Sequence, residues 1–244
     1  MKDNFSARSD KYARFRPNYP AELYTFLLSL VNTKENAWDC GTGNGQIAKE
    51  LSKHFTTVYA TDISESQIMN AFGAENIFYK VEAVENVAFP PHFFDLIIVG
   101  QAIHWFDFDR FYKVVKRTLK EDGIFAIAGY GLFRAGDETD KAVDHFYNNV
   151  TGPYWDKERQ YVDEAYATIP FPFKEIQTPE LSVSYQWDFE HLIGYLETWS
   201  AVQHYIKATG KDPVEEFRSE LQKTWPANTI KTVTFNIFMR AGTL

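Results

Sequence analysis

Three glycines alternate with other residues in the segment A-W-D-C-G-T-G-N-G-Q, residues 37–46. Gly41, Gly43 and Gly45 allow the backbone to turn sharply and to approach a ligand closely. An apolar segment precedes this loop, and apolar residues at helical spacing follow it. The start of a helix offers unpaired N–H groups and the positive end of its dipole. The sequence therefore predicts a strand, a glycine loop and a helix that bind a nucleotide-type cofactor.

Gln46 distinguishes between two cofactor classes. The dinucleotide fingerprint G-x-G-x-x-G/A has a small residue at the place that Gln46 occupies. The segment reads instead D-x-G-x-G-x-G, from Asp39 to Gly45. This pattern resembles motif I of the class I S-adenosylmethionine-dependent methyltransferases, in which the loop surrounds the amino-acid end of the cofactor. An NAD-dependent reductase is the weaker alternative.

A second acidic residue ends the next predicted strand, Val58–Asp62. Rossmann-like folds place a carboxylate that binds a ribose diol about 20 residues beyond the glycines. Asp62 could instead cap the following helix, although Ser64 suits that role equally well. We favour ribose binding because the glycine loop lies upstream.

His104 follows the predicted fourth strand, Phe94–Gly100. This strand is an almost unbroken apolar run, which is typical of a parallel strand buried on both faces. Ligands of such sheets bind at the carboxyl ends of the strands. His104 is therefore the candidate catalytic residue, as a general base for a hydroxyl or an amine. The alternatives are a structural histidine and a simple substrate contact.

Predicted strands and helices alternate along the first half of the chain. Strands are predicted at Asn36–Cys40, Val58–Asp62, Ile77–Val81, Phe94–Gly100 and Ile124–Ala128. This alternation indicates an α/β fold with a doubly wound, Rossmann-like sheet in a single domain of 244 residues. After Gly129 the pattern changes, and residues 131–179 are predicted to form a cap insertion over the site. Residues 1–20 interleave arginine with tyrosine and phenylalanine, which fits a folded lid arm as well as it fits a solvated arm.

The composition argues against several partners and compartments. The net charge is −8 and no long basic run occurs, so a general nucleic-acid binder is not expected. Cys40 is the only cysteine, which excludes an intramolecular disulfide and favours the cytosol. Neither a signal peptide nor an apolar run of about 20 residues is recognisable. We expect a cytoplasmic monomer or weak homodimer that binds no membrane, needs no metal and acts on a small molecule.

Two longer motifs are similar to one subgroup of class I methyltransferases. Q-A-I-H-W-F-D at Gln101–Asp107 and Y-x-x-x-R-P-x-Y-P at Tyr12–Pro20 resemble the trans-aconitate methyltransferase-like enzymes, also called methyltransferase type 11. W-S-A at Trp199–Ala201 and G-K-D-P at Gly210–Pro213 are similar to the same subgroup. The resemblance spans nearly the whole chain. It implies a seven-stranded sheet with an antiparallel last strand, and S-adenosyl-L-methionine as cofactor.

The resemblance also implies roles for individual residues. Asp39 and the three glycines would hold the methionine end of the cofactor, Asp62 the ribose hydroxyls, and Ile63 would pack against the adenine. Further cofactor contacts are implied for Val84 and Glu85 after the third strand, Gln101 and Ala102 after the fourth, and Tyr12 and Arg16 in the lid. Because residues 82–85 read E-A-V-E where the family has G-x-A-E, backbone contacts to adenine are expected there.

The acceptor is expected to be a small organic molecule, with O-methylation of a carboxylate as the first hypothesis. A sulfonium methyl group is already activated, so the enzyme must align the reactants and exclude water. A carboxylate acceptor needs no base. The substrate pocket is expected to include Trp105, Tyr130, Trp199 and Tyr205, with further walls from Phe133, Tyr154 and Trp155 and anchors from Arg14, His104 or Arg240.

Two alternatives remain open at this point. A hydroxyl or amine acceptor would use His104 as the base, and a non-catalytic protein would bind S-adenosylmethionine without methyl transfer. Nucleic-acid methyltransferases are weaker alternatives. G-Q-A-I follows the fourth strand in place of an N-P-P-Y-like segment, and Cys40 lies in the wrong loop for a cytosine C5 enzyme.

Overall fold

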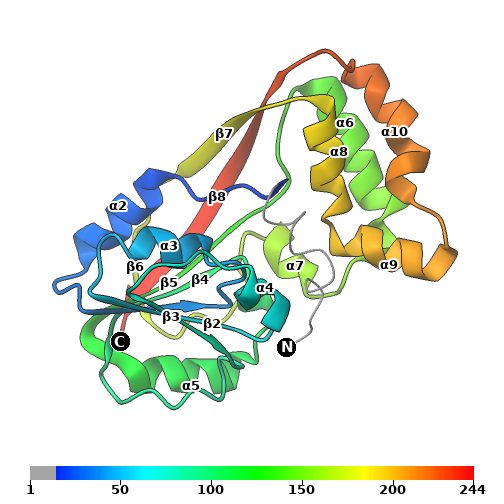
Figure 1. Ribbon diagram of the computed structural model, residues 1–244. Helices are drawn as coiled ribbons and strands as arrows, with labels where there is room; N and C mark the ends of the chain where they lie inside the picture. Colours follow the sequence, from blue (N-terminus) through cyan, green and yellow to red (C-terminus); the bar gives the residue numbers. More distant parts are fainter. Residues whose placement is uncertain (1–14) are drawn as a thin grey trace.

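The computed structural model describes residues 15–244 and contains a twisted sheet with helices on both faces (Figure 1). The strands are β1 Asn36–Cys40, β2 Thr57–Asp62, β3 Ile77–Val81, β4 Phe94–Gly100, β5 Leu119–Tyr130, β6 Lys174–Ile176, β7 Leu181–Trp187 and β8 Lys231–Thr243. Their order is β3-β2-β1-β4-β5-β8, and both β6 and β7 pair with the outer edge of β8. Strands β1 to β5 are parallel, and β8 is antiparallel to β5. The predicted doubly wound sheet with an antiparallel last strand is confirmed, with two short strands in the place of one edge strand.

Helices on the two faces of the sheet enclose two hydrophobic clusters. Helices α2 (Ala21–Leu30) and α3 (Gln46–Leu51) cover one face, where Leu96 and Ile98 of β4 are buried. Helix α5 (Phe108–Thr118) covers the other face, where Ile97 and Val99 are buried. The alternation of β4 side chains between the two clusters explains why its sequence is apolar throughout. Helix α4 (Glu65–Met69) follows β2.

A group of helices lies beyond one end of the sheet (Figure 1). Its members are α6 (Asp137–His145), the turns η3 (Phe146–Val150) and η4 (Gly152–Tyr154), α8 (Phe189–Glu197), α9 (Ser200–Thr209) and α10 (Pro213–Thr224). Two separate parts of the chain, before β6 and between β7 and β8, therefore contribute to this helical part. The segment 131–179 supplies the first part, the short helix α7 (Arg159–Asp163) and strand β6, which belongs to the sheet.

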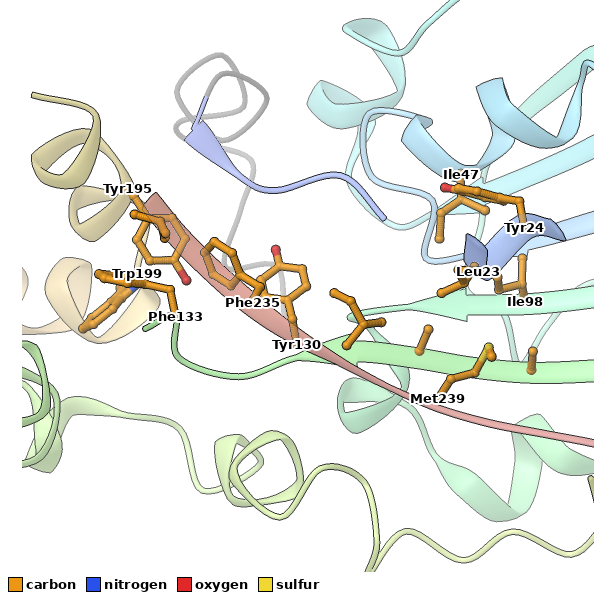
Figure 2. Packing of buried hydrophobic residues seen from close by; sticks show 14 of the residues in the cluster. Leu23, Tyr24, Ile47, Ile98, Tyr130, Phe133, Tyr195, Trp199, Phe235 and Met239 are labelled. Carbon is orange, nitrogen blue, oxygen red and sulfur yellow. The ribbon is translucent and has the colours of Figure 1, made fainter. Parts of the chain in front are cut away.

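The long strand β8 joins the sheet to the helical part. One half pairs with β5, and the other half extends beyond it as a ribbon with β7, from Leu181↔Ile237 to Trp187↔Lys231. A continuous hydrophobic cluster follows this strand (Figure 2). It runs from Ile98 through Tyr130 and Phe235 to Trp199 in the helical part. The described residues contain no helix that is both long and apolar enough to span a lipid bilayer.

Candidate functional site

The glycine loop connects β1 to α3 in a left-handed backbone conformation. The φ angles are 68° at Gly41, 56° at Gly43 and 81° at Gly45. A Cβ atom on Gly41 would lie 2.7 Å from the Cβ of Ala102, and one on Gly45 would lie 2.1 Å from the Tyr79 hydroxyl oxygen. Side chains at these two positions are therefore excluded by both strain and contact. The loop packs directly on the segment that follows β4.

Asp39 places a buried carboxylate beneath the loop. Its Oδ2 accepts hydrogen bonds from the Thr42 hydroxyl at 2.6 Å and from the Ala48 backbone N–H at 3.0 Å. Its Oδ1 is buried and has no hydrogen-bond partner among residues 15–244. Burial, and to a lesser extent the charge of Asp62, raise the Asp39 pKa to about 7. An unpartnered buried oxygen of this kind fits an ammonium group, as the amino-acid end of S-adenosylmethionine supplies.

Asp62 ends β2 beside the same loop. One of its oxygens accepts the Gly43 backbone N–H at 2.9 Å and the other accepts the Ser64 backbone N–H at 2.8 Å. Ser64 is the N-cap of α4, because its hydroxyl accepts from the Gln67 N–H. Asp62 is thus tied to the glycine loop and does not cap the helix itself. Each carboxylate oxygen can accept more than one hydrogen bond, so this position also suits the hydroxyls of a ribose.

The remaining predicted cofactor residues differ in exposure. Ile63 is half-buried next to Asp62, and Val84 is fully buried in the cluster under α5. The Glu85 carboxylate accepts the Asp107 backbone N–H at 3.1 Å, so this side chain is held against the start of α5. Tyr12 and Arg14 lie outside the described residues, as does most of the predicted lid arm.

Two cavities meet at the carboxyl ends of β1 and β4. The first, the loop cavity, has a volume of about 70 Å³ and is lined by Asp39, the loop from Gly41 to Asn44, and Tyr130. The second, the histidine cavity, has a volume of about 30 Å³ and is lined by His104, among others. Arg16 and Gln101 line both cavities. The two spaces are therefore neighbours, with a guanidinium and an amide between them.

Gln101 is held rigidly between the two cavities. Its φ is 54°, an uncommon conformation for a residue other than glycine. Its side-chain amide makes two hydrogen bonds of 2.9 Å with the Tyr130 backbone, donating to the carbonyl and accepting from the N–H. These bonds join the ends of β4 and β5. Tyr130 was expected in the substrate pocket, but the structure places it on the loop cavity, against Tyr19.

Arg16 connects the described part of the predicted arm to the helical part. Its Nη2 donates to the Thr198 carbonyl at 3.1 Å, and its guanidinium lies 5.4 Å from the centre of the Tyr195 ring. The Phe15 ring packs where Gly194 leaves room for it, since a Cβ on Gly194 would lie 2.5 Å from that ring. Residues 15 and 16 thus contact α8 and its C-terminal end, and the chain then passes both cavities before it enters α2.

His104 lies in the short helical turn η2 (Ile103–Trp105) and is only 6% exposed. Its Nδ1 lies 3.1 Å from the Tyr166 hydroxyl. Burial, followed by the positive charge of Arg159, lowers the His104 pKa to about 3. The ring is therefore neutral at physiological pH and is a weak proton acceptor. Trp105, which the sequence analysis places in the substrate pocket, lines the histidine cavity beside it.

Arg159 is a cavity residue that the sequence analysis missed. Its Nε donates to the Tyr147 hydroxyl at 2.8 Å and to Asp163 Oδ1 at 3.3 Å. Its guanidinium lies 4.8 Å from the centre of the Trp155 ring, which also lines the cavity. Nη1 and Nη2 have no hydrogen-bond partner among residues 15–244. The sequence signal was an arginine four residues after a tryptophan in an aromatic segment.

Two other polar residues, Asp156 and Ser200, line the histidine cavity and were also missed. The Asp156 carboxylate lies 3.8 Å from Nδ1 of His204. The cavity therefore contains both signs of charge. No group of three or more His, Cys, Asp or Glu side chains suited to a metal ion occurs within the described chain.

Three residues expected in the substrate pocket lie elsewhere. Trp199 is 2% exposed and packs in the core against Phe146 and Trp155. Tyr205 packs against the Tyr154 ring and donates to Glu216 at 3.4 Å, at the surface of the helical part. Arg240 binds Glu175 at 2.7 Å and the carbonyls of Tyr166 and Ile169, so its guanidinium has a structural role. Core packing and ion pairing, which depend on the tertiary fold, decide these positions.

Comparisons with known proteins agree with this geometry. Residues 38–127 match a family described as a methyltransferase domain. A Dictyostelium discoideum protein, provisionally named a methyltransferase, is 34% identical over 97% of this chain and 93% of its own length. An Aspergillus terreus methyltransferase is 30% identical over 54% of this chain and 45% of its own.

Solved structures extend the similarity to the fold. A structure from Anaeromyxobacter dehalogenans, provisionally described as a type II methyltransferase, has a TM-score of 0.86 and 37% identity, covering 94% of this chain and 98% of its own. A methyltransferase structure from Anabaena variabilis, at 15% identity and a TM-score of 0.57, shares the fold alone and covers 93% of this chain and 98% of its own. The D-x-G-x-G-x-G loop, the unpartnered Asp39 oxygen and a relative that matches almost the whole chain agree with one another, and the chain belongs to the class I S-adenosylmethionine-dependent methyltransferases.

Proposed function

We propose that this methyltransferase methylates a carboxylate oxygen of a small organic acid whose carboxylate group is held in the histidine cavity. The observation that carries the proposal is Arg159. Its Nε is held by Tyr147 and Asp163, while Nη1 and Nη2 have no partner within residues 15–244. Two parallel N–H groups of a guanidinium match the two oxygens of a carboxylate. Stacking on Trp155 fixes the plane of this fork.

The chemistry of a carboxylate acceptor suits the protonation state of the site. S-adenosylmethionine supplies an electrophilic methyl group: the acceptor oxygen forms the new C–O bond while the C–S bond breaks, and the sulfur keeps the electron pair. A carboxylic acid is already ionised at neutral pH, so no proton has to be removed. Neutral His104, with a pKa lowered to about 3, would be a poor base for a hydroxyl or an amine. The site therefore favours an acceptor that needs no base.

The position of the histidine cavity beside the loop cavity is a second argument for this function. Arg16 and Gln101 line both cavities, so an acid held by Arg159 lies next to the cavity formed by the cofactor loop. Trp105 and Trp155 line the same space, and their apolar surface would help to exclude water once an acceptor is bound. The task of the chain is to hold the acceptor oxygen in line with the methyl carbon and the sulfur. The similarity of Gln101–Asp107 to the trans-aconitate methyltransferase-like enzymes also favours an acid.

A methyl-transfer assay with labelled S-adenosylmethionine tests the proposal. The acceptors are small carboxylic acids, each paired with the alcohol and the amine of the same skeleton. We expect the acids to be methylated preferentially and the esters to be found by mass spectrometry. Preferential methylation of the amines or alcohols would overturn the proposal; amines are included because Asp156 lines the same cavity.

Arg159→Gln should lower kcat/KM for the acids about 10- to 150-fold, since a hydrogen bond to a charged group contributes about 1.5–3 kcal/mol. Arg159→Lys should recover part of this loss, because lysine keeps the charge but not the fork. Arg218→Gln is the matched control: Arg218 is likewise paired with a carboxylate and placed over an aromatic ring, but it lies on α10. Equal kcat/KM for Arg159→Gln and Arg218→Gln would contradict the proposed anchor.

A further inference from the structure

Two successive residues after α7 adopt the left-handed backbone conformation without being glycine. The φ angles are 50° at Ala165 and 61° at Tyr166. This conformation commonly ends helices, but glycine usually occupies it, and a bulky residue there is strained. Each such residue is strained and persists only where the surroundings enforce it. The chain therefore keeps a tyrosine where a glycine would be less strained.

The surroundings hold Tyr166 from two sides. Its side chain is fully buried, with its ring at 4.8 Å from the Phe238 ring on β8. Its backbone carbonyl accepts from Arg240 Nη1 at 3.1 Å, and the same group binds the Ile169 carbonyl at 2.8 Å. Glu175 in turn fixes the Arg240 guanidinium. These contacts direct the Tyr166 hydroxyl toward His104. Its oxygen lies 3.1 Å from Nδ1 of His104, a residue 62 positions earlier in the sequence.

The direction of this hydrogen bond follows from the chemistry of the two groups. A phenol O–H is a stronger donor than an imidazole N–H, and an imidazole lone pair is a stronger acceptor than a phenol oxygen. His104 is neutral, because burial and Arg159 disfavour its charged form and lower its pKa. A neutral ring carries one proton, and the nitrogen that accepts a hydrogen bond cannot be the one that carries it. Tyr166 therefore donates to Nδ1, and the proton of His104 is on Nε2.

Nε2 is the atom that His104 can offer to a ligand. It has no hydrogen-bond partner within the described chain. Among residues 15–244 it is not one of the fully enclosed side-chain atoms that lack a partner, so part of its surface is accessible. His104 lines the histidine cavity together with Arg159. It also lines a wider outer cavity of about 610 Å³ that Tyr161 and Phe108 border. A donor at this position faces the space assigned above to the acceptor.

We propose that Tyr166 is a positioning residue that fixes His104 as a neutral Nε2–H donor, and that this N–H holds an oxygen of the acceptor carboxylate. The second half of the inference rests on the proposed function, and the first half does not. A neutral donor fixes the rotation of the carboxylate while Arg159 provides the charge. The attacking oxygen thus keeps more of its electron density than it would between two cations.

Nitrogen NMR of the full chain labelled with ¹⁵N-histidine tests the first half without any substrate. Ring nitrogens with and without a proton have well separated shifts, and His104→Gln identifies the signals of His104. We expect Nδ1 without and Nε2 with a proton in the parent protein, and a mixture of both forms in Tyr166→Phe. A proton on Nδ1 in the parent protein, or the same pattern in Tyr166→Phe, would overturn the inference.

Kinetics with a carboxylic acid identified in the acceptor assay tests the second half. Tyr166→Phe should lower kcat about 2- to 12-fold, which corresponds to one neutral hydrogen bond, with a smaller change in KM. His104→Gln should retain more activity than His104→Ala, because the glutamine amide restores an N–H near Nε2. Tyr112→Phe is the matched control, since Tyr112 is a buried tyrosine whose hydroxyl binds the Pro170 carbonyl away from the cavity. Equal kcat for the two phenylalanine variants, or no rescue by glutamine, would refute the donor role. A failure of acids as substrates would leave the NMR result intact, so the two ideas fail separately.

Discussion

Asp39→Asn should make the protein more stable in the absence of cofactor while weakening its binding of the cofactor. Burial raises the Asp39 pKa from the ordinary 3.8 to about 7, so the folded chain binds more protons than the unfolded chain between these values. Stability therefore falls as pH rises through this window and remains at the lower level above it. A shift of about three units corresponds to roughly 4 kcal/mol, to order of magnitude.

Asparagine removes this charge and can still accept from Thr42 and Ala48. Urea unfolding without cofactor should thus show Asp39→Asn to be more stable than the parent at pH 8, by up to about 4 kcal/mol, and by less than half of that difference at pH 5. A variant that is less stable than the parent at pH 8 would refute the reasoning, because the buried charge would then be compensated by groups within the protein.

In contrast to stability without cofactor, cofactor binding should be stronger in the parent protein than in Asp39→Asn. The ammonium group of S-adenosylhomocysteine stabilises the ionised form of Asp39, so binding near pH 7 should release a proton. Calorimetry in two buffers with different ionisation enthalpies measures this release. 5′-Methylthioadenosine, which lacks the amino-acid end, is the control and should release none. Asp39→Asn should bind S-adenosylhomocysteine about 10- to 150-fold more weakly and bind the control compound unchanged. Equal proton release with both compounds would contradict the assignment.

Two further outcomes test the rest of the cofactor site. Asp62→Ala should weaken S-adenosylhomocysteine binding by about 1.5–3 kcal/mol, and Asp62→Asn by less, because asparagine retains one of the acceptor oxygens. Unchanged affinity in calorimetry would mean that Asp62 only holds the glycine loop and the start of α4. Protease cleavage within residues 1–19 should slow when S-adenosylhomocysteine is added, because Arg16 borders both cavities; equal rates with and without it would argue against a lid.

The sheet and the cofactor loop were predictable from the sequence because their signals are local. The loop and the strand end before it are contiguous, and the apolar run of β4 needs no knowledge of its neighbours. The place of Asp62 beside the loop could be predicted because a Rossmann-like fold fixes its distance along the chain from the glycines. Alternation in the sequence also indicates β7, whereas β6 was not visible, since it has only three residues and depends on the outer edge of β8.

The acceptor side was less predictable because it is assembled from η2, the segment after η4, α7 and the start of α9. Sequence patterns indicate that an aromatic residue is buried but not whether it faces a cavity. Trp155 and Trp199 pack against each other, and only Trp155 borders the histidine cavity. The same limit applies to arginine. Arg240 meets Glu175 through strand pairing, whereas the aromatic ring of Trp155 and the hydroxyl of Tyr147 orient Arg159.

The hydrophobic cluster along β8 has a consequence for how the molecule unfolds and how it can diverge. Because Phe235 packs on Tyr195 of the helical part and on Tyr130 of the sheet, neither part can separate without exposing aromatic surface of the other. Unfolding should therefore be a single cooperative transition instead of two. Relatives with other acceptors are then expected to differ at the cavity walls and to retain this aromatic connection, since an exchange of the whole helical part would also remove core residues that pack on β8.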